Sequence, residues 1–303
     1  MNSSNIQIPK VSIGMPVFNG EQSIGKAIEA ILSQTYPHFE LIVSDNASTD
    51  STQLICKEYA RKDTRIRYIR QNENNGIFWN FNFVLHEARC DYFVWHGSDD
   101  FWEPNFLEKN VKMLESDSSL VGSRGEVRFY DPNDVFGIYK HHITRLSGTY
   151  EEKVKYYLKF LTGTNVMSVY RTKCLQKGAV HKPMSAWDWA VDINALKYGD
   201  VYVFDEVLMY RFPRGRSSER SMFRKMHLQN VSLLDTIFLN MPFTTWCAKN
   251  LGSKIFLKNM GYFAKLVFDG ELITAKTLAK ILIAKIQGKD AYTRNSQQKQ
   301  KSG

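Results

Sequence analysis

The chain has 303 residues, of which 43% are hydrophobic and 23% are charged, and a formal net charge of +9. This is the composition of a folded globular protein with one large domain or two. No apolar run reaches the roughly 18 residues of a spanning helix, so no transmembrane helix is expected. The N-terminus lacks the basic and apolar regions of a signal peptide.

The positive charge is concentrated in the last third of the chain. Residues 211–303 contain 17 Lys and Arg against 5 Asp and Glu, a net charge of +12, whereas residues 1–210 carry −3. Such a basic region favours nucleic acid, anionic lipid or a phosphorylated ligand. Four scattered cysteines without metal-ligand spacing indicate reduced thiols of a cytosolic protein: Cys56, Cys90, Cys174 and Cys247.

Apolar stretches alternate with helical patterns over the first 114 residues. Strands are expected at Val11–Met15 (ended by Pro16), Leu41–Ser44, Ile66–Ile69 and Tyr92–Trp95. Helices are expected at Glu21–Gln34, Ser51–Arg61, Asn80–Ala88 and from Pro104 to about Leu114. This alternation predicts parallel strands joined by right-handed crossovers.

From about Leu120 the pattern is less regular. Strands are expected at Val127–Tyr130, Val135–Tyr139, Asn165–Tyr170, Val201–Phe204 and Val207–Tyr210. Helices are expected at Tyr150–Phe160 and around Trp189–Tyr198. Beyond Arg216 only helical patterns follow, and residues 297–303 are expected to be disordered.

Two acidic turns come directly after apolar strands. Asp45 follows the second strand, and Asp99 and Asp100 follow the fourth. Carboxylates at the carboxyl ends of strands in an open α/β sheet project into the crevice where such sheets bind ligands. Clustered oxygen donors there suit a divalent cation and a phosphate ester. Asp50 is interpreted as a helix cap instead, because Asp50 and Gln53 have capping-box spacing.

Several short motifs, in this order and at this spacing, resemble family 2 glycosyltransferases of the GT-A fold, which include many bacterial polysaccharide and lipopolysaccharide transferases. The motifs are Val11–Asn19, Ile42–Asp50, Asn74–Gly76, Ser98–Asp100, Trp187–Asp188 and Asp205–Arg211. The resemblance implies a mostly parallel central sheet flanked by helices, with a Rossmann-like nucleotide-binding half. It also implies a catalytic domain over 1–218 and a basic, amphipathic helical extension over 219–303.

The resemblance assigns the donor site. Asp45 would accept a hydrogen bond from the ring N–H of uracil or thymine, an edge that a carboxylate favours over cytosine. Asp99 would bind Mn²⁺ or Mg²⁺ against the donor diphosphate. The remaining residues expected to bind the nucleotide sugar are Pro16, Phe18, Asn19, Asn46, Asn75, Ser98, Asp100, Arg211, Arg214 and Arg216.

Two positions depart from the family pattern. Gly97 stands where many relatives have an Asp that contacts the ribose, so ribose recognition passes to Asp100 or a backbone group. Phe81 stands where relatives often have an Arg near the base or phosphates. Trp79 either supplies a stacking face in place of that Arg or is a core residue. His96 is either a metal ligand or a buried structural histidine.

The resemblance makes Asp188 the catalytic base. Trp187 replaces the usual Glu before it, and reduced solvation there would raise the pKa of Asp188 toward the range useful for base catalysis. A helix N-cap is the alternative, and one residue can serve both roles. Arg211, Arg214 and Arg216 either neutralise the leaving diphosphate or belong to the exposed basic tail. Residues 163–165 resemble the stretch ahead of the acceptor-binding strand.

The basic tail mixes apolar residues with lysines. Lys254/Lys258 and Lys276/Lys280 are each four residues apart and share a helical face. Such helices can lie on anionic membranes, the alternative being domain packing with a solvated basic face. We therefore expect a cytoplasmic protein with peripheral contact to the inner face of the membrane.

The resemblance implies an inverting, metal-dependent glycosyltransferase. The donor would be a UDP- or dTDP-sugar, and the acceptor a glycan or lipid-linked glycan of a bacterial envelope. One alternative is an enzyme like sugar-1-phosphate nucleotidylyltransferases, although Val11–Asn19 offers neither a Gly-rich phosphate loop nor a Lys. Another is a catalytically impaired module that binds a nucleotide or sugar. Nucleic acid is not the expected partner.

Overall fold

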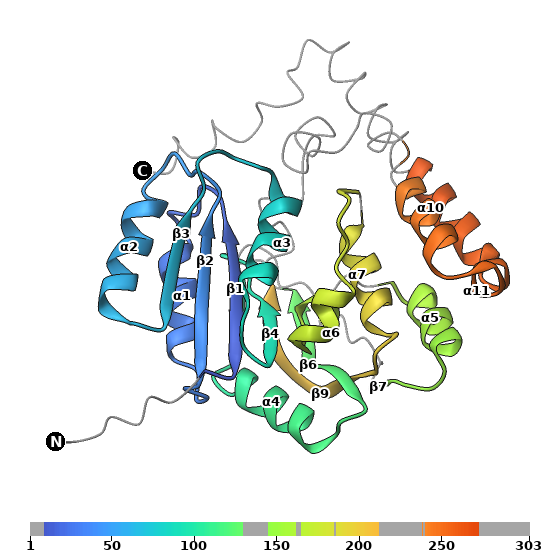
Figure 1. Cartoon of the computed structure of the whole chain (residues 1–303), viewed down its shortest axis with the longest axis horizontal. Helices are drawn as coiled ribbons and strands as arrows, with labels where there is room; N and C mark the ends of the chain where they lie inside the picture. The colour runs from blue at the N-terminus through green and yellow to red at the C-terminus, as the bar shows by residue number, and fades with distance from the viewer. Residues whose placement is uncertain are drawn as a thin grey trace, which may run out of the picture.

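The computed structural model describes residues 9–129, 145–161, 165–184, 186–211, 238 and 240–272, and shows one sheet with helices packed around it (Figure 1). The strands are β1 (Val11–Val17), β2 (Phe39–Asp45), β3 (Ile66–Arg70), β4 (Tyr92–Trp95), β5 (Phe101–Trp102), β6 (Leu120–Phe129), β7 (Arg145–Leu146), β8 (Val169–Arg171) and β9 (Asp200–Arg211). The helices are α1 (Ile24–Leu32), α2 (Thr52–Lys62), α3 (Ile77–Glu87), α4 (Phe106–Ser116), α5 (Tyr150–Lys159), the 3-10 turn η1 (Asn165–Met167), α6 (Thr172–Lys177), α7 (Trp187–Ala195), α10 (Met241–Asn250) and α11 (Ser253–Lys258). Residues 260–272 are also helical.

The sheet is mostly parallel, which confirms the α/β prediction. Its strand order is β3-β2-β1-β4-β8-β6-β9-β5, with β7 beside β9. Strands β1 to β4 run parallel, as does the β6–β9 pair. The short strands β5, β7 and β8 are antiparallel to their neighbours. All positions of β1 are buried, which explains its continuous apolar sequence.

Local differences from the sequence prediction have identifiable causes. Strand β1 continues through Pro16 to Val17, because β4 pairs with β1 only as far as Gly14 and leaves that side of Pro16 without a ladder. Residues expected as two strands form the single strand β9, whose register against β6 shifts around Glu126. The expected strand at 165–170 is η1 followed by β8. The expected strand at 135–139 lies outside the described residues.

The C-terminal helices pack against the second half of the sheet domain, beside α5 and α7 (Figure 1). Phe243 of α10 is fully buried, with its ring centroid 5.4 Å from that of Trp189. Lys254 and Lys258 of α11 pair with Glu151 of α5 at 3.6 and 2.5 Å. The expected domain boundary at residue 218 lies outside the described residues and stays a prediction. In the described part of the chain, no helix is both long and apolar enough to cross a bilayer.

Candidate active site

A cleft of about 350 Å³ opens at the carboxyl ends of β1, β2 and β4, the edge at which open α/β sheets bind ligands. Eight of the predicted site residues line it: Pro16, Phe18, Asn19, Asn46, Ser98, Asp99, Asp100 and Arg211. The other lining residues are Val17, Ser23, Asn74, Ile77, Phe81, Gly97 and Met167. The acidic turn after β4 and the end of β9 therefore meet at one site.

Some predicted residues are not part of this lining. Asp45, Asn75 and Asp188 are not among the lining residues. Arg214 and Arg216 lie outside the described residues, as do 163 and 164 of the expected acceptor stretch. Of the lining residues that sequence reasoning missed, Ile77 shares a face of α3 with Phe81, four residues on. The local sequence around Met167 does not indicate that it lines the cleft. Its position in η1 depends on the pairing of β8 with β4 and β6, which are distant in the sequence.

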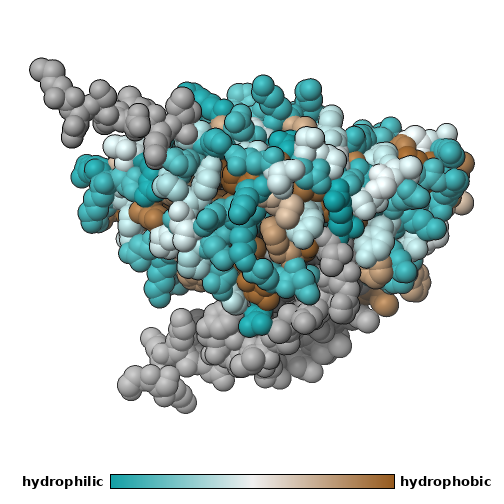
Figure 2. Space-filling model, turned by 90° about the horizontal axis from the view of Figure 1, so that it is seen from below, coloured by the Kyte–Doolittle hydropathy of each residue, from teal (hydrophilic) through white to brown (hydrophobic). Residues whose placement is uncertain are grey.

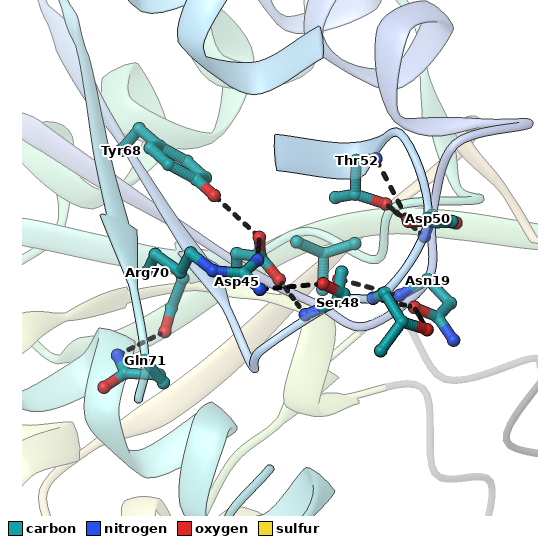
Figure 3. Close-up of polar contacts among 12 residues, drawn as sticks. Asn19, Asp45, Ser48, Asp50, Thr52, Tyr68, Arg70 and Gln71 are labelled. Atoms are coloured by element: carbon teal, nitrogen blue, oxygen red, sulfur yellow. Dashed lines mark hydrogen bonds and ion pairs between the residues drawn. The ribbon is translucent and has the colours of Figure 1, made fainter. Parts of the chain in front are cut away.

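Hydrogen bonds join the turns after β1 and β2. Asn19 has a positive φ of 52°, which brings its amide N–H to 2.9 Å from the Ser48 hydroxyl (Figure 3). Its side-chain carbonyl accepts from the Thr49 N–H at 2.8 Å. Asp50 accepts from the backbone N–H groups of Thr52 and Glu21. Its structural role is thus confirmed, but the predicted capping box is wrong, because the N-cap of α2 is Ser51.

Asp45 lies behind the cleft and is fully buried. One oxygen accepts from the Ser48 N–H at 2.8 Å, and the other accepts from Tyr68 at 2.6 Å and from Arg70 Nη1 at 2.8 Å (Figure 3). The parallel register places Arg70 directly opposite Asp45. Burial and the Asp45 carboxylate raise the pKa of Tyr68, which remains a hydrogen-bond donor. Asp45 therefore has no exposed surface and does not itself line the cleft.

Amide side chains fasten the β2 turn to the start of α3. The Asn46 amide donates to Asn74 Oδ1 at 2.8 Å, and its carbonyl accepts from the Asn75 N–H at 3.0 Å. Gly76, at the N-cap of α3, has a φ of 86°, which favours glycine at this position. Asn46 and Asn74 therefore present amide groups to the cleft. Asn75 does not line the cleft, and its backbone N–H helps to hold Asn46 in place.

The turn after β4 holds two carboxylates in the cleft. Asp100 is only 3% exposed, and its Oδ1 lies 3.5 Å from Arg211 Nε. Burial raises the pKa of Asp100, while Arg211 lowers it. A Cβ on Gly97 would lie 2.7 Å from Asp100 Oδ2, so Asp100 occupies the space that a larger residue at 97 would need.

This turn fits a divalent cation held by few protein ligands. The buried Oδ2 of Asp100 has no hydrogen-bond partner in the described residues, and Asp99 lines the same cleft. Two carboxylates are the whole acidic set here, because no group of three His, Cys, Asp or Glu that could hold a metal gathers at this turn or anywhere else in the described part of the chain. Mg²⁺ is commonly bound through one or two carboxylates plus substrate phosphates, which matches Asp99 and Asp100.

Two residues left open by the sequence do not line the cleft. His96 is fully buried, its ring lies 4.4 Å from that of Trp102, and burial lowers its pKa to about 4. It is therefore a neutral structural histidine. Trp79 is 38% exposed and stacks on Phe83 with 5.0 Å between ring centroids. It belongs to the surface of α3.

Asp188 is half-buried in the first turn of α7. The N-cap is Ala186, with a φ of 59°, so the interpretation of Asp188 as the N-cap is wrong. Burial raises the pKa of Asp188 to about 6, although the N–H groups of residues 188 and 189 and the charge of Arg211 lower it. The ring centroid of Trp187 lies 5.3 Å from that of Phe81, which lines the cleft. Asp188 therefore lies next to the cleft wall and within the electrostatic reach of Arg211.

A mostly parallel α/β sheet with amide and carboxylate side chains gathered at a cleft beyond the carboxyl ends of its strands is the arrangement of a ligand-binding α/β domain. A family model described as glycosyl transferase family 2 matches residues 12–178. The chain belongs to this family.

Curated relatives support the family assignment. The chain is 42% identical over 108 residues to the putative glycosyltransferase EpsE of Bacillus subtilis, a match covering 35% of this chain and 39% of EpsE. It is 34% identical over 117 residues to the putative teichuronic acid biosynthesis glycosyltransferase TuaG of the same organism, covering 39% of this chain and 46% of TuaG. The chain thus spans less than half the length of these two relatives.

Solved structures confirm the fold. Staphylococcus aureus TarS 1–349 in complex with UDP-GlcNAc matches with a TM-score of 0.60 at 17% identity, covering 92% of each chain. Mannosyltransferase PcManGT from Pyrobaculum calidifontis, in complex with GDP-Man and Mn²⁺, matches with a TM-score of 0.57 at 17% identity. That match covers 92% of this chain and 76% of PcManGT.

Proposed function

We propose that the protein transfers a sugar, with inversion, from a UDP- or dTDP-sugar to a hydroxyl of a glycan or glycolipid in bacterial envelope polysaccharide synthesis. The observation that carries this proposal is the position of Arg211. It lies 3.5 Å from Asp100 of the acidic turn, and its charge lowers the pKa of Asp188 on α7. The candidate diphosphate site and the candidate base therefore share one cation. The relation to EpsE and TuaG supports the polysaccharide context.

In this proposal Asp188 takes the proton of the acceptor hydroxyl as that oxygen attacks the anomeric carbon. The bond between the anomeric carbon and the diphosphate breaks on the opposite face, so the configuration inverts. With a pKa raised to about 6 by burial, Asp188 is mostly ionised at pH 7 and is still basic enough to accept a proton. A more exposed Asp, with a lower pKa, would be a weaker base.

The leaving diphosphate needs positive charge. Asp99 and Asp100 would hold Mn²⁺ or Mg²⁺, which would supply charge neutralisation to the phosphate oxygens. Arg211 lines the same cleft and would bind a phosphate oxygen, with Arg214 and Arg216 following it in the chain. Asn19, Asn46 and Ser98 offer neutral hydrogen-bonding groups for the nucleotide and sugar. Asp45 would contact the base only after Arg70 or Tyr68 releases it.

The C-terminal helices suit a lipid-linked acceptor at an anionic membrane surface. Leu257, Met260 and Phe268 are 59, 54 and 68% exposed. The Lys254 and Lys265 side chains nearby in the sequence are 75 and 72% exposed. Hydrophobic residues interrupt the hydrophilic surface at the right-hand end of Figure 2, the end that α10 and α11 form in Figure 1. This mixture of apolar and basic side chains favours an interfacial position.

Metal removal tests the proposal. EDTA should abolish release of UDP or dTDP from a nucleotide sugar, and Mn²⁺ or Mg²⁺ should restore it, because the cleft carries two carboxylates that must be neutralised before a diphosphate can bind. Asp99→Asn should weaken metal-dependent donor binding in calorimetry. Full turnover in chelator would contradict the metal role. Donor binding without turnover for any acceptor would favour the impaired binding module that Gly97 and Phe81 suggest.

A further inference from the structure

A buried polar chain lies behind Asp188. Asp192, one turn further along α7, is 2% exposed. The Tyr157 hydroxyl of α5 lies 2.7 Å from Asp192 Oδ2, and the Tyr170 hydroxyl of β8 lies 3.1 Å from Asp192 Oδ1. The Tyr170 hydroxyl also lies 2.9 Å from the backbone carbonyl oxygen of Asn165. Asp192 therefore connects three elements that surround the candidate base.

Counting protons favours a protonated Asp192. A tyrosine hydroxyl has one hydrogen, and a backbone carbonyl can only accept. The Tyr170 hydroxyl lies near two oxygens, that of Asn165, which also accepts from the Ser168 N–H at 2.8 Å, and Asp192 Oδ1. If its hydrogen goes to the nearer of them, the Asn165 carbonyl, an ionised Asp192 would leave two buried oxygens 3.1 Å apart without a hydrogen between them. A protonated Asp192 satisfies every contact, because its Oδ1–H donates to Tyr170, Tyr170 donates to Asn165, and Tyr157 donates to Oδ2.

The charged groups around Asp192 are consistent with this assignment. Arg124 of β6 is the nearby cation, but it donates to the Asn165 side-chain oxygen and the Gly125 carbonyl at 2.9 Å each. The other groups that influence Asp192 are Tyr157, Tyr170 and Asp188. Burial raises the pKa of Asp192 to about 8, and the negative charge of Asp188 raises it too. The hydrogen bond from Tyr157 and the charge of Arg124 lower it.

We propose that Asp192 is a positioning residue that stays protonated at neutral pH and, by carrying no charge, leaves Asp188 free to act as the ionised base. This inference rests on the proposed role of Asp188. A second carboxylate one helical turn away, in a buried setting, would make proton loss from Asp188 less favourable. The two acids therefore have different protonation states because their surroundings differ, an arrangement that acid–base catalysis often uses.

Infrared spectroscopy of the full chain tests the protonation of Asp192. At pH 7 the wild type should show a carboxylic acid C=O band that Asp192→Asn lacks and that Asp188→Asn retains. The band should disappear as the pH rises through about 8. Tyr170→Phe should shift the band, because the acid loses its hydrogen-bond acceptor. A wild-type spectrum at pH 7 identical to that of Asp192→Asn would overturn the proposal.

Kinetics test the positioning role. Asp192→Ala removes the hydrogen bonds to Tyr157 and Tyr170. It should lower kcat by about tenfold, a loss corresponding to ~1.4 kcal/mol. Asp192→Asn should restore most of that loss, because its amide can donate to Tyr170 and accept from Tyr157 without a charge. If Asp192→Asn folds normally and remains as impaired as Asp192→Ala, the positioning role is wrong. If Asp188→Asn keeps full turnover while the Asp192 band persists, the proposed base is wrong and the protonation of Asp192 stands.

Discussion

Asp45 and Asp188 are acids near the same cleft, but their partners give them different chemistry. Asp45 is fully buried and accepts from Ser48, Tyr68 and Arg70, so it organises the β2 turn. The Asp188 carboxylate accepts instead from backbone N–H groups of its own helix turn, and burial raises its pKa to about 6. An acid with an elevated pKa is suited to proton transfer.

Asp188→Asn should therefore lower kcat by ~10²-fold or more, the scale of losing a general base, while the donor Kd stays nearly constant. In the wild type, kcat/KM should fall as the pH drops through about 6, because protonated Asp188 cannot accept the acceptor proton. Steady-state kinetics and calorimetry with the nucleotide sugar measure the two effects. Asp205→Asn, at an exposed position of β9, is the matched control and should behave as wild type. Undiminished turnover in Asp188→Asn would exclude it as the base.

At the scale of elements, the turn between β4 and β5 depends on the absence of a side chain at Gly97. Gly97→Ala would place a Cβ 2.7 Å from Asp100 Oδ2 and 3.2 Å from Asp99 Oδ1. The Asp100 carboxylate must then shift from its place in the cleft, so metal-dependent donor binding should weaken about tenfold, or ~1.4 kcal/mol. Calorimetry with UDP and Mn²⁺ measures this. Gly261→Ala is the control, since a Cβ there meets nothing within 4 Å. Equal affinities for the two variants would contradict the constraint.

The sequence predicted the elements that repeat a simple pattern. Tyr92–Trp95 is β4 as expected, and the apolar spacing of α1 predicted its buried residues, Ile24, Ala27, Ile28 and Ile31. The strand expected at Asn165–Tyr170 overlaps β8, but the bounds and antiparallel direction of β8 were not predictable, because three residues carry no periodicity and its place between β4 and β6 is set by tertiary pairing. The partners of Asp45 are set by the register of β3 against β2, and those of Asp192 by the packing of α5 and β8 around α7. Local sequence patterns encode neither of these long-range contacts.

At the scale of the whole molecule, the C-terminal helices offer a test of membrane contact. They cannot simply be removed, because Phe243 and Cys247 of α10 are fully buried. Substituting the exposed Leu257, Met260 and Phe268 by Ser should instead reduce co-sedimentation with vesicles containing phosphatidylglycerol, since apolar insertion is lost. Added salt should reduce binding further by screening the lysines.

The control for this experiment is Leu54→Ser. Leu54 is 72% exposed on α2, in the nucleotide-binding half of the sheet domain. Its replacement should leave vesicle binding unchanged, because it removes apolar surface away from the basic helices. Equal partitioning of the triple variant and the wild type would show that the C-terminal surface does not touch lipid.

Arg211 lies within reach of two acids for which different roles are proposed. It ends β9, pairs with Asp100 and lowers the pKa of Asp188. In the proposed reaction a diphosphate bound in the cleft would compete for that same cation, so donor binding would weaken the hold of Arg211 on Asp188 and would make the carboxylate more basic. Readiness to deprotonate an acceptor would then depend on occupancy by the co-substrate, and losses from altering these three side chains should not be additive.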